Sequence, residues 1–307
     1  MKKQIQLAIE ALLRGDPIGL PTETVYGLAA PIFDEKAIKR VFELKGRPQD
    51  NPLIAHISHL DQVHQIAIDI PEAFYELAKV FFPGPLTIVL KKHPDVPAIV
   101  SGGLDTIAIR MPSHPLAKEI IQGVGQPLVA PSANISGKPS STCVEHVKED
   151  FLEQLACIVD GGPSVYGLES TVLSLVHPKP TILRPGEISK EQIEKVLQGK
   201  ICVGSGQEKI SPGTRYRHYA PKAKIVLFED IEKLQKELEE KRPEKCWILA
   251  REKHNFSVPT FALYRSNLYS LFRDADRLKC KEIWIYIDSV LKEDTTLMNR
   301  IFKASQP

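Results

Sequence analysis

Short apolar segments alternate with amphipathic segments along most of this chain. Residues 18–21 and 52–57 are largely apolar runs of the length expected for buried strands. Between them, Asp34 stands where a helix-capping residue is expected. The residues that then recur at helical spacing are Ala37, Ile38, Val41 and Phe42. Strand and helix patterns that alternate in this way predict an α/β fold.

The first residues of the chain also have an amphipathic pattern. The apolar positions at helical spacing are Ile5, Ile9, Leu12 and Leu13. Glu10 interrupts this apolar stretch and no small-residue cleavage site follows, so the pattern predicts a helix that ends at Gly15 rather than a signal peptide. No apolar run approaches the roughly 18 residues that cross a membrane. We therefore expect a cytoplasmic protein without membrane contact.

Consecutive apolar segments follow one another near residues 156–184 without a helical pattern between them. The first domain is therefore predicted to contain a large twisted mixed β-sheet with flanking helices, not a purely parallel sheet. Two capping boxes are predicted at helix starts, one formed by Ser58 and Asp61 and the other by Ser189 and Gln192.

The periodic pattern stops between residues 201 and 221, which are rich in Gly, Ser and Pro. Strands and helices alternate again after this segment, which predicts a small Rossmann-like α/β domain. We therefore expect a first domain over 1–200, a linker or lid over 201–221 and a second domain over 222–307. Residues 215–219 form a cationic and aromatic run, which suits either base stacking and phosphate contact or a solvated linker.

Composition narrows the range of functions. The 307 residues carry a formal net charge of only +2, which argues against coating nucleic acid by bulk charge but allows a local basic pocket. The sequence has five cysteines, an odd number, so a disulfide framework is not predicted. No two of them form a C-x-x-C pair, so a zinc site is not predicted either. This cysteine usage favours a reducing compartment.

The usual nucleotide-binding signatures are missing from the sequence, which contains neither G-x-x-x-x-G-K-[ST] nor G-x-G-x-x-G. Phosphate binding would therefore depend on side chains in irregular loops. Three segments have suitable residues, P-T-E-T-V-Y-G at 21–27, K-G-R-P-Q-D-N-P-L at 45–53 and A-P-S-A-N-I-S-G-K-P-S-S at 130–141. Taken singly, each is also compatible with an ordinary connection, a helix C-terminus or a polar surface loop.

Two of these loops together predict an anion site. Lys45 and Arg47 place two cations beside a break in regular structure, which suits a triphosphate. Ser132 and Asn134 are two residues apart, and on an extended stretch they would face one anion together. We expect the loops around residues 45–51 and 130–140 to meet in space and to form a cationic, hydroxyl-lined cradle.

Two arginines lie in or beside apolar strands. Arg110 needs an anionic partner if it is half-buried, and that partner could be a substrate carboxylate, Asp105 or Glu119. Arg184 comes at the end of the last strand of the first domain. Its side chain could point into a site or lie on the surface.

Eight motifs occur in one order along the chain. They are P-T-E-T-V-Y-G-L, K-G-R-P-x-D-N-P-L, F-P-G-P-L-T, I-A-I-R-M-P, A-P-S-A-N-x-S-G, D-G-G with G-x-E-S-T-V, I-L-R-P-G and R-H-Y-A-P. In this combination the chain resembles the threonylcarbamoyl-AMP synthase family, the YrdC-like enzymes, in its longer two-domain form. The resemblance covers nearly all of the first domain and the linker, and it implies a mixed twisted sheet around a basic concave cavity.

The resemblance also implies a reaction and its residues. L-threonine, bicarbonate or CO2, and ATP would give threonylcarbamoyl-AMP and pyrophosphate, and a tRNA-modifying threonylcarbamoyl transferase machinery would accept the product. Catalysis would fall to Lys45, Arg47, Ser132 and Asn134. The implied ATP contacts are Lys45, Arg47, Asn51, Thr106, Ser132, Asn134, Ser140, Arg184 and Tyr219. The implied threonine contacts are Thr24, His56, Arg110 and Ser170. Mg2+ would be bound through the ATP phosphates, not by protein side chains.

Three other functions stay open at this point. A double-stranded RNA-binding module would hold RNA in the basic cavity, although the small net charge and the lack of a basic stripe argue against tight binding. A carbamoyl-transfer or hydrogenase-maturation enzyme would carry zinc-type cysteine motifs, which this sequence lacks. A sensor would bind threonine or nucleotide without any reaction. Weak RNA binding is compatible with the enzyme as well.

Overall fold

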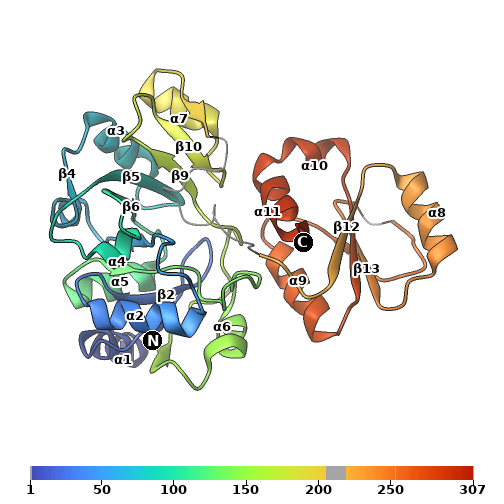
Figure 1. Ribbon diagram of the computed structural model, residues 1–307, viewed down its shortest axis with the longest axis horizontal. Coiled ribbons are helices and arrows are strands. Elements are labelled where there is room, and N and C mark those ends of the chain that lie inside the picture. The colour runs from blue at the N-terminus through green and yellow to red at the C-terminus, as the bar shows by residue number, and fades with distance from the viewer. Residues whose placement is uncertain (1, 205–218, 253, 307) are drawn as a thin grey trace. The chain divides into compact units, whose positions relative to one another are not determined.

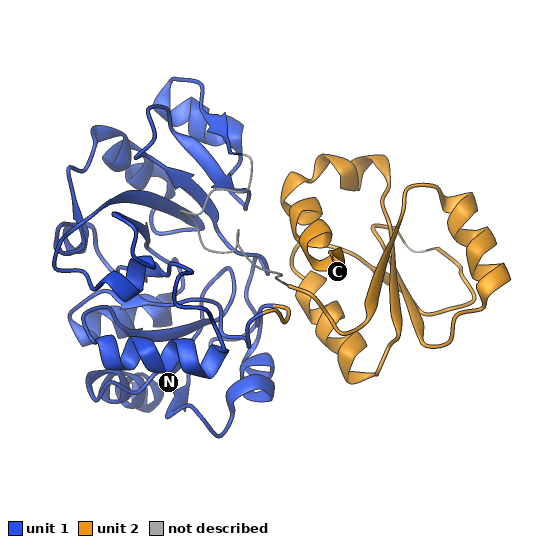
Figure 2. Cartoon of the chain, in the orientation of Figure 1, with its two compact units in different colours: residues 1–136, 140–216 blue, residues 137–139, 217–307 orange. Residues whose placement is uncertain are grey.

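The computed structural model of the protein describes residues 2–204, 219–252 and 254–306 (Figure 1). The chain divides into two compact units (Figure 2). Residues 1–136 and 140–216 form the first unit, and residues 137–139 and 217–307 form the second. Each unit contains its own β-sheet.

A mixed sheet of eleven strands, counted over the described residues, forms the centre of the first unit. Its order is β11-β10-β9-β5-β6-β3-β7-β2-β1-β8, with β4 paired to β5. The strands are β1 Ile18–Leu20, β2 Gly27–Pro31, β3 Ile54–His56, β4 Ala67–Ile68, β5 Leu86–Lys92, β6 Thr106–Arg110, β7 Leu128–Val129, β8 Cys157–Ile158, β9 Thr171–Ser174, β10 Thr181–Arg184 and β11 Cys202–Val203. Because β6 pairs parallel to β3 and antiparallel to β5, the predicted mixed sheet is confirmed.

Helices flank this sheet (Figure 1). They are α1 Lys2–Leu13, α2 Glu35–Lys45, the 3-10 helix η1 Leu60–Gln65, α3 Glu72–Phe81, α4 Ala98–Ser101, α5 Pro115–Val124, α6 Val144–Phe151 and α7 Lys190–Leu197. The side chain of Asp34 caps α2, as predicted, by accepting the backbone N–H groups of Lys36 and Ala37. The helix ends at Gly46, whose left-handed conformation (φ 57°) suits glycine and turns the chain away after Lys45.

The two faces of the large sheet are covered differently. On one face, α2 packs on the sheet through an apolar core that includes Phe42, Leu28 and Ile109. On the other face, α1 and α5 pack over β1, β2 and β7 through residues such as Leu12 and Ile120. Further along the sheet is a separate small apolar group, Ile54, Val89, Ala108, Val172 and Leu183. Strand side chains alternate between faces, so this small group shares its face with the polar residues of the candidate site.

The two predicted capping boxes have different outcomes. At α7, the Ser189 hydroxyl accepts the N–H of Gln192 at 3.3 Å and the Gln192 side chain accepts the N–H of Ser189 at 2.8 Å, so this capping box is confirmed. The box predicted from Ser58 and Asp61 is wrong. A 3-10 helix starts there, and the N–H of Ser58 donates instead to the side chain of Gln62 at 2.8 Å.

The predicted linker is not irregular throughout. Its first residues form β11, which pairs parallel to β10 because Cys202 and Val203 continue the edge of the sheet. Residues 205–218 lie outside the described residues, and so do four of the five residues in the cationic and aromatic run at 215–219.

The described residues of the second unit form a four-stranded parallel sheet in the order β12-β15-β13-β14. Its elements are β12 Lys224–Phe228, α8 Ile231–Lys241, β13 Cys246–Ala250, β14 Thr260–Ala262, α9 Leu268–Arg277, β15 Glu282–Tyr286, α10 Ser289–Glu293 and α11 Thr295–Ser305. This arrangement agrees with the predicted small α/β domain. None of the helices in the described parts of the chain is long and apolar enough to span a membrane.

The capping box at α7 provides a test of the fold. Replacing Ser189 with Ala removes the hydroxyl that accepts the Gln192 N–H. We expect the free energy of unfolding to fall by about 1 kcal/mol, as measured by urea titration followed by circular dichroism. Ser189→Asn keeps an acceptor at this position and should stay close to the parent protein. Equal losses in both variants would contradict a capping role.

Candidate functional site

The two loops that were predicted to form an anion site meet in the first unit. Lys45 is only 1% exposed, and its ammonium group donates to the backbone carbonyl oxygens of Ser132 and of Asn134, the latter at 2.6 Å. In return, the N–H of Ser136 donates to the carbonyl oxygen of Lys45 at 2.8 Å. The prediction that these loops meet is confirmed, and Lys45 itself connects them.

The conformation expected for Ser132 and Asn134 is wrong. The N–H of Asn134 donates to the carbonyl oxygen of Ser132 at 2.9 Å, so the chain makes a tight turn here and is not extended. This turn aims both carbonyl oxygens at Lys45. The Asn134 side chain donates to the carbonyl oxygen of Ile135 at 2.8 Å, while Ser132 is half-buried. Backbone groups, not side chains alone, therefore shape this loop.

Arg47 and Asn51 lie together in the loop after α2. The Arg47 guanidinium donates to the carbonyl oxygens of Asn51 at 3.4 Å and Pro52 at 3.0 Å, which closes the loop on itself. The Asn51 side chain is 1% exposed, and its amide oxygen has no hydrogen-bond partner among the described residues. A buried acceptor without a partner is costly, so this oxygen is well suited to receive a donor from a ligand.

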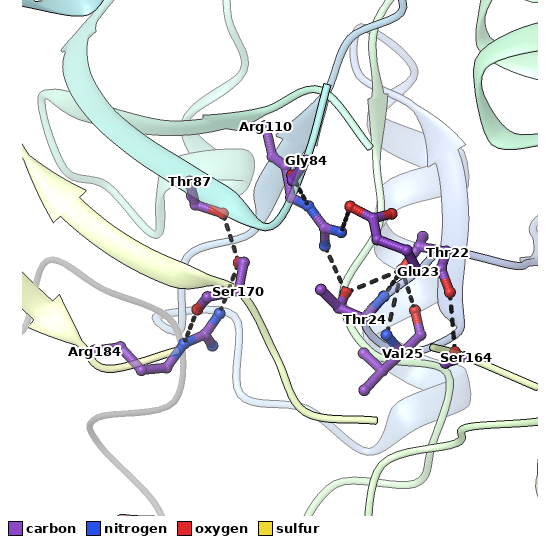
Figure 3. A network of polar contacts seen from close by, with 10 residues as sticks. All are labelled: Thr22, Glu23, Thr24, Val25, Gly84, Thr87, Arg110, Ser164, Ser170 and Arg184. Carbon is purple, nitrogen blue, oxygen red and sulfur yellow. Dashed lines mark hydrogen bonds and ion pairs between the residues drawn. The ribbon is translucent and has the colours of Figure 1, made fainter. Parts of the chain in front are cut away.

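The P-T-E-T-V-Y-G segment at 21–27 lies against two parts of the first unit. One is the loop at 130–141, called the serine-rich loop below, and the other is the strand β6. The backbone N–H of Tyr26 donates to the carbonyl oxygen of Ser141 at 2.8 Å. The carbonyl oxygen of Tyr26 accepts the N–H of Ala133 at 2.7 Å. On the other side, Arg110 donates to the hydroxyl of Thr24 at 2.7 Å (Figure 3). This segment therefore connects the serine-rich loop to the end of β6.

Arg110 is 4% exposed and has an anionic partner within the chain. That partner is neither Asp105 nor Glu119 but Glu23, whose Oε1 lies 2.6 Å from Arg110 Nη2. Arg110 Nε also donates to the carbonyl oxygen of Gly84 at 3.2 Å (Figure 3). The sequence reasoning missed Glu23 because it considered carboxylates close to Arg110 in sequence. The signal was available, since Glu23 stands inside a motif already singled out.

Arg184 and Ser170 form a second buried group beside Arg110 (Figure 3). Arg184 is 4% exposed, so it points inward and is not a surface residue. It donates from Nε to the carbonyl oxygen of Ser170 at 3.1 Å and from Nη2 to the Ser170 hydroxyl at 3.2 Å. The Ser170 hydroxyl also lies 2.7 Å from that of Thr87, a residue that the sequence reasoning did not select.

His56 is the neighbour of Arg110 across the pair of strands β3 and β6. The imidazole is buried, and its Nδ1 lies 3.2 Å from the carbonyl oxygen of Ile54, which fits an N–H donor at that nitrogen. Burial, together with the positive charge of Arg110, lowers the pKa of His56 to about 3. His56 is therefore a neutral ring at ordinary pH, with its Nε2 left as an acceptor.

A further contact joins the serine-rich loop to the residues around Ser170. The hydroxyl of Ser140, fully buried, donates to Oε1 of Glu169 at 2.6 Å, and Glu169 directly precedes Ser170 in the chain. The candidate phosphate cradle, formed by the loops of Lys45 and Ser132, is therefore part of one polar region with Arg110 and Ser170. Glu169 is another residue that the sequence reasoning did not select.

One residue implied by the resemblance, Thr106, lies away from the Arg110 contacts described above. Thr106 begins β6 and shares a face with Arg110, but the two residues are four positions apart, or about 13 Å along a strand. Thr106 lines a cavity of about 390 Å³ together with Lys91, Asp105 and Val176, among others. Its role stays a prediction.

Tyr219 belongs to the second unit. Its ring stacks on Tyr269 with centroids 5.4 Å apart, and the guanidinium of Arg300 lies 5.6 Å from its centroid. Its predicted role as an ATP contact is not tested. As for metals, the described residues contain no group of three or more His, Cys, Asp or Glu side chains that could hold an ion.

Comparison with known proteins identifies the family of this chain. Residues 10–186 match the family described as "Telomere recombination", and residues 188–306 match the "Threonylcarbamoyl-AMP synthase, C-terminal domain". A threonylcarbamoyl-AMP synthase of Pyrococcus abyssi is 40% identical to this chain. The alignment covers 98% of this chain and 94% of the relative. A threonylcarbamoyl-AMP synthase of Bacillus subtilis is 48% identical, in an alignment that covers 74% of this chain and 67% of the relative.

The fold comparison agrees with the sequence comparison. The crystal structure of P. abyssi Sua5 complexed with L-threonine matches with a TM-score of 0.92 at 41% identity, covering 99% of this chain and 95% of that one. Both domains match, and both the sequence and the structural likeness extend over nearly the whole chain. The chain therefore belongs to the threonylcarbamoyl-AMP synthase family.

Proposed function

We propose that this protein joins L-threonine, bicarbonate or CO2, and ATP into L-threonylcarbamoyl-AMP, with release of pyrophosphate. The observation that carries this proposal is the single polar region in which the loops of Lys45 and Ser132 meet each other and continue to Arg110. It offers cations and oxygen acceptors for a nucleotide next to a buried arginine for an amino acid. The names of the relatives point to the same reaction.

The ATP phosphates are assigned to the cradle of the two loops, where Lys45 and Arg47 supply positive charge and Ser132, Asn134 and Ser140 supply hydrogen bonds. The amide oxygen of Asn51 is a buried acceptor that fits a hydroxyl of the nucleotide or a water molecule on a hydrated metal ion. Mg2+ held on the phosphates would shield their charge. The further ATP contacts are proposed to be Thr106, Arg184 and Tyr219.

The threonine carboxylate is assigned to Arg110. Arginine carries five N–H donors. Arg110 donates to Gly84 and Thr24 and forms an ion pair with Glu23, so at least two of its donors are left that no described residue takes up. Two donors on one guanidinium suit a carboxylate. The other proposed threonine contacts are the hydroxyls of Thr24 and Ser170 and the neutral ring of His56.

The chemistry then needs positioning and charge stabilisation but no covalent enzyme intermediate. The threonine ammonium group first gives one proton to bicarbonate or water. The resulting neutral amine attacks CO2 and gives a second proton to the same acceptors as the carbamate forms. A carbamate oxygen forms a bond to the α-phosphorus of ATP, and the bond from that phosphorus to the bridging oxygen breaks. Pyrophosphate leaves with the electron pair, and Lys45 and Arg47 stabilise its charge.

The product is a mixed anhydride of AMP, which suits transfer of its threonylcarbamoyl group to an acceptor. We propose that a tRNA-modifying transferase machinery receives it and modifies the adenosine beside the anticodon. Weak binding of RNA and a cytoplasmic location are part of the same proposal.

A direct assay tests the proposed reaction. The full chain is incubated with ATP, Mg2+, bicarbonate and L-threonine, and pyrophosphate and the adenylate product are measured. We expect both products only when threonine and bicarbonate are present. Pyrophosphate release that does not depend on threonine would contradict the proposal, and so would tight RNA binding without any ATP binding.

Arg47 provides a test of charge stabilisation. Arg47→Ala removes a donor that is proposed to stabilise the charge of the leaving pyrophosphate. We expect threonine-dependent pyrophosphate release to fall about a hundredfold, which corresponds to about 3 kcal/mol. Arg40→Ala is the matched control, because Arg40 lies in the preceding helix α2 with 53% of its side chain exposed. Unchanged turnover in Arg47→Ala would remove this residue from the mechanism.

The neutral state of His56 provides a test by pH. The pKa of His56 is lowered from 6.5 to about 3 in the fold, so below pH 6.5 the unfolded chain takes up a proton that the folded chain does not. Stability must therefore fall with decreasing pH over this window, by up to about 1.4 kcal/mol per pH unit.

The expected result concerns the slope of stability with pH. His56→Gln should have a shallower decrease in unfolding free energy between pH 6.5 and 4.5 than the parent protein, measured by urea unfolding at each pH. The slope decides the question even if the variant is less stable at every pH. Identical slopes would mean that His56 is protonated in the folded protein.

A further inference from the structure

The ion pair between Glu23 and Arg110 is the feature of the site that the proposed reaction does not yet use. Glu23 Oε1 lies 2.6 Å from Arg110 Nη2, and both side chains are only 5% exposed (Figure 3). Glu23 is held in place by its neighbours in sequence, since Thr22 bonds to the backbone of Val25 at 2.6 Å and Ser164 bonds to the backbone of Thr22 at 2.9 Å. These bonds fix the backbone on either side of Glu23, and the ion pair places its carboxylate beside the guanidinium.

Stability alone is a weak reason for such a pair. Removing two charges from water costs more than their attraction commonly returns, and apolar residues of similar volume often give equal or greater stability. Here Arg110 shares its sheet face with the apolar residues Ile54 and Ala108. The location of the pair, at the proposed amino-acid position, points instead to recognition of a ligand.

The pair has the charge pattern that an amino acid requires. Arg110 and Glu23 bring one positive and one negative charge side by side, and the buried His56 ring beside them is uncharged. An amino acid likewise presents a carboxylate and an ammonium group on the same carbon atom. Two opposite charges at neighbouring positions therefore match a zwitterion, whereas a lone guanidinium would accept any carboxylate of suitable size.

We propose that Glu23 is a specificity-determining residue that selects a ligand with an α-amino group, by pairing with its ammonium form while Arg110 binds the carboxylate. This inference rests on the proposed function and adds the way in which the site distinguishes an amino acid from a hydroxy acid of the same shape. Rejection arises because an acid without the ammonium group brings its negative charge next to Glu23 with no compensation.

The charge state of Glu23 agrees with this role. Burial acts to raise the pKa of the carboxyl, but the charge and hydrogen bond of Arg110 outweigh it, with help from backbone N–H groups, and the pKa lies below its ordinary value. The carboxylate stays ionised at neutral pH and is a weak base. Glu23 therefore orients the amino group and does not serve as the base that removes its proton.

A pair of ligands tests this inference directly. L-threonine and 3-hydroxybutyrate share the carboxylate, the hydroxyl and the methyl group, and they differ in the amino group. Their dissociation constants are measured by calorimetry on the full chain, for the parent protein and for Glu23→Gln. We expect the parent to prefer threonine, and we expect this preference to decrease about tenfold or more in Glu23→Gln, since a charged hydrogen bond is lost.

A matched control separates recognition from general loss of an ion pair. Asp294 in the second unit accepts two hydrogen bonds from Arg265, at 2.8 and 2.9 Å. Asp294→Asn makes the same chemical change in an ion pair of the other unit, whose arginine and aspartate side chains are 35% and 24% exposed. We expect the preference for threonine over 3-hydroxybutyrate to be unchanged in this variant.

The outcomes distinguish this inference from the proposed function. If the parent protein binds threonine but Glu23→Gln keeps the same preference, even with a lower melting temperature, the pair is structural and the inference is wrong. Equal affinity of the parent protein for both ligands would also overturn it, and this measurement does not depend on the variant being folded. If the parent protein does not bind threonine at all, the proposed function itself fails.

Discussion

The burial of positive charge is the constraint on which the first unit depends. Lys45, Arg110 and Arg184 are each at most 4% exposed. A buried cation must be hydrogen-bonded or paired, because the loss of hydration is otherwise too costly. For Lys45 and Arg110 the compensating oxygen atoms come from segments 26 to 89 positions away in sequence, so these loops must approach one another for the chain to fold.

This constraint also bears on how the proposed phosphate site is built without a glycine-rich signature. In the usual signatures, backbone N–H groups of a tight loop receive the phosphate. Here a lysine at the end of α2 is held by two carbonyl oxygens of a tight turn, and an adjacent arginine closes its own loop. The small apolar group of Ile54, Val89, Ala108, Val172 and Leu183 belongs to the strands of the sheet. It lies on the sheet face that α1 and α5 cover further along.

Local patterns in the sequence predict local structure well, and contacts between distant segments less well. Asp34 and Ser189 were recognised as caps because a cap depends on residues two or three positions away. The loops around Lys45 and Ser132 were expected to meet because their chemistry is complementary. The turn at Ser132 was not expected, since it depends on packing against Tyr26, and the partner of Arg110 was sought nearby although it is 87 positions away, at Glu23.

Two polar groups of the site are incompletely bonded by the chain alone. The amide oxygen of Asn51 has no partner among the described residues, and two N–H donors of Arg110 are not taken up there. Buried groups of this kind lower the stability of the ligand-free fold by about 1–3 kcal/mol each. A ligand that supplies the missing partners both gains affinity and stabilises the folded state, because it binds that state alone. The same unsatisfied groups therefore suit the nucleotide and the amino acid that are proposed as ligands of this site.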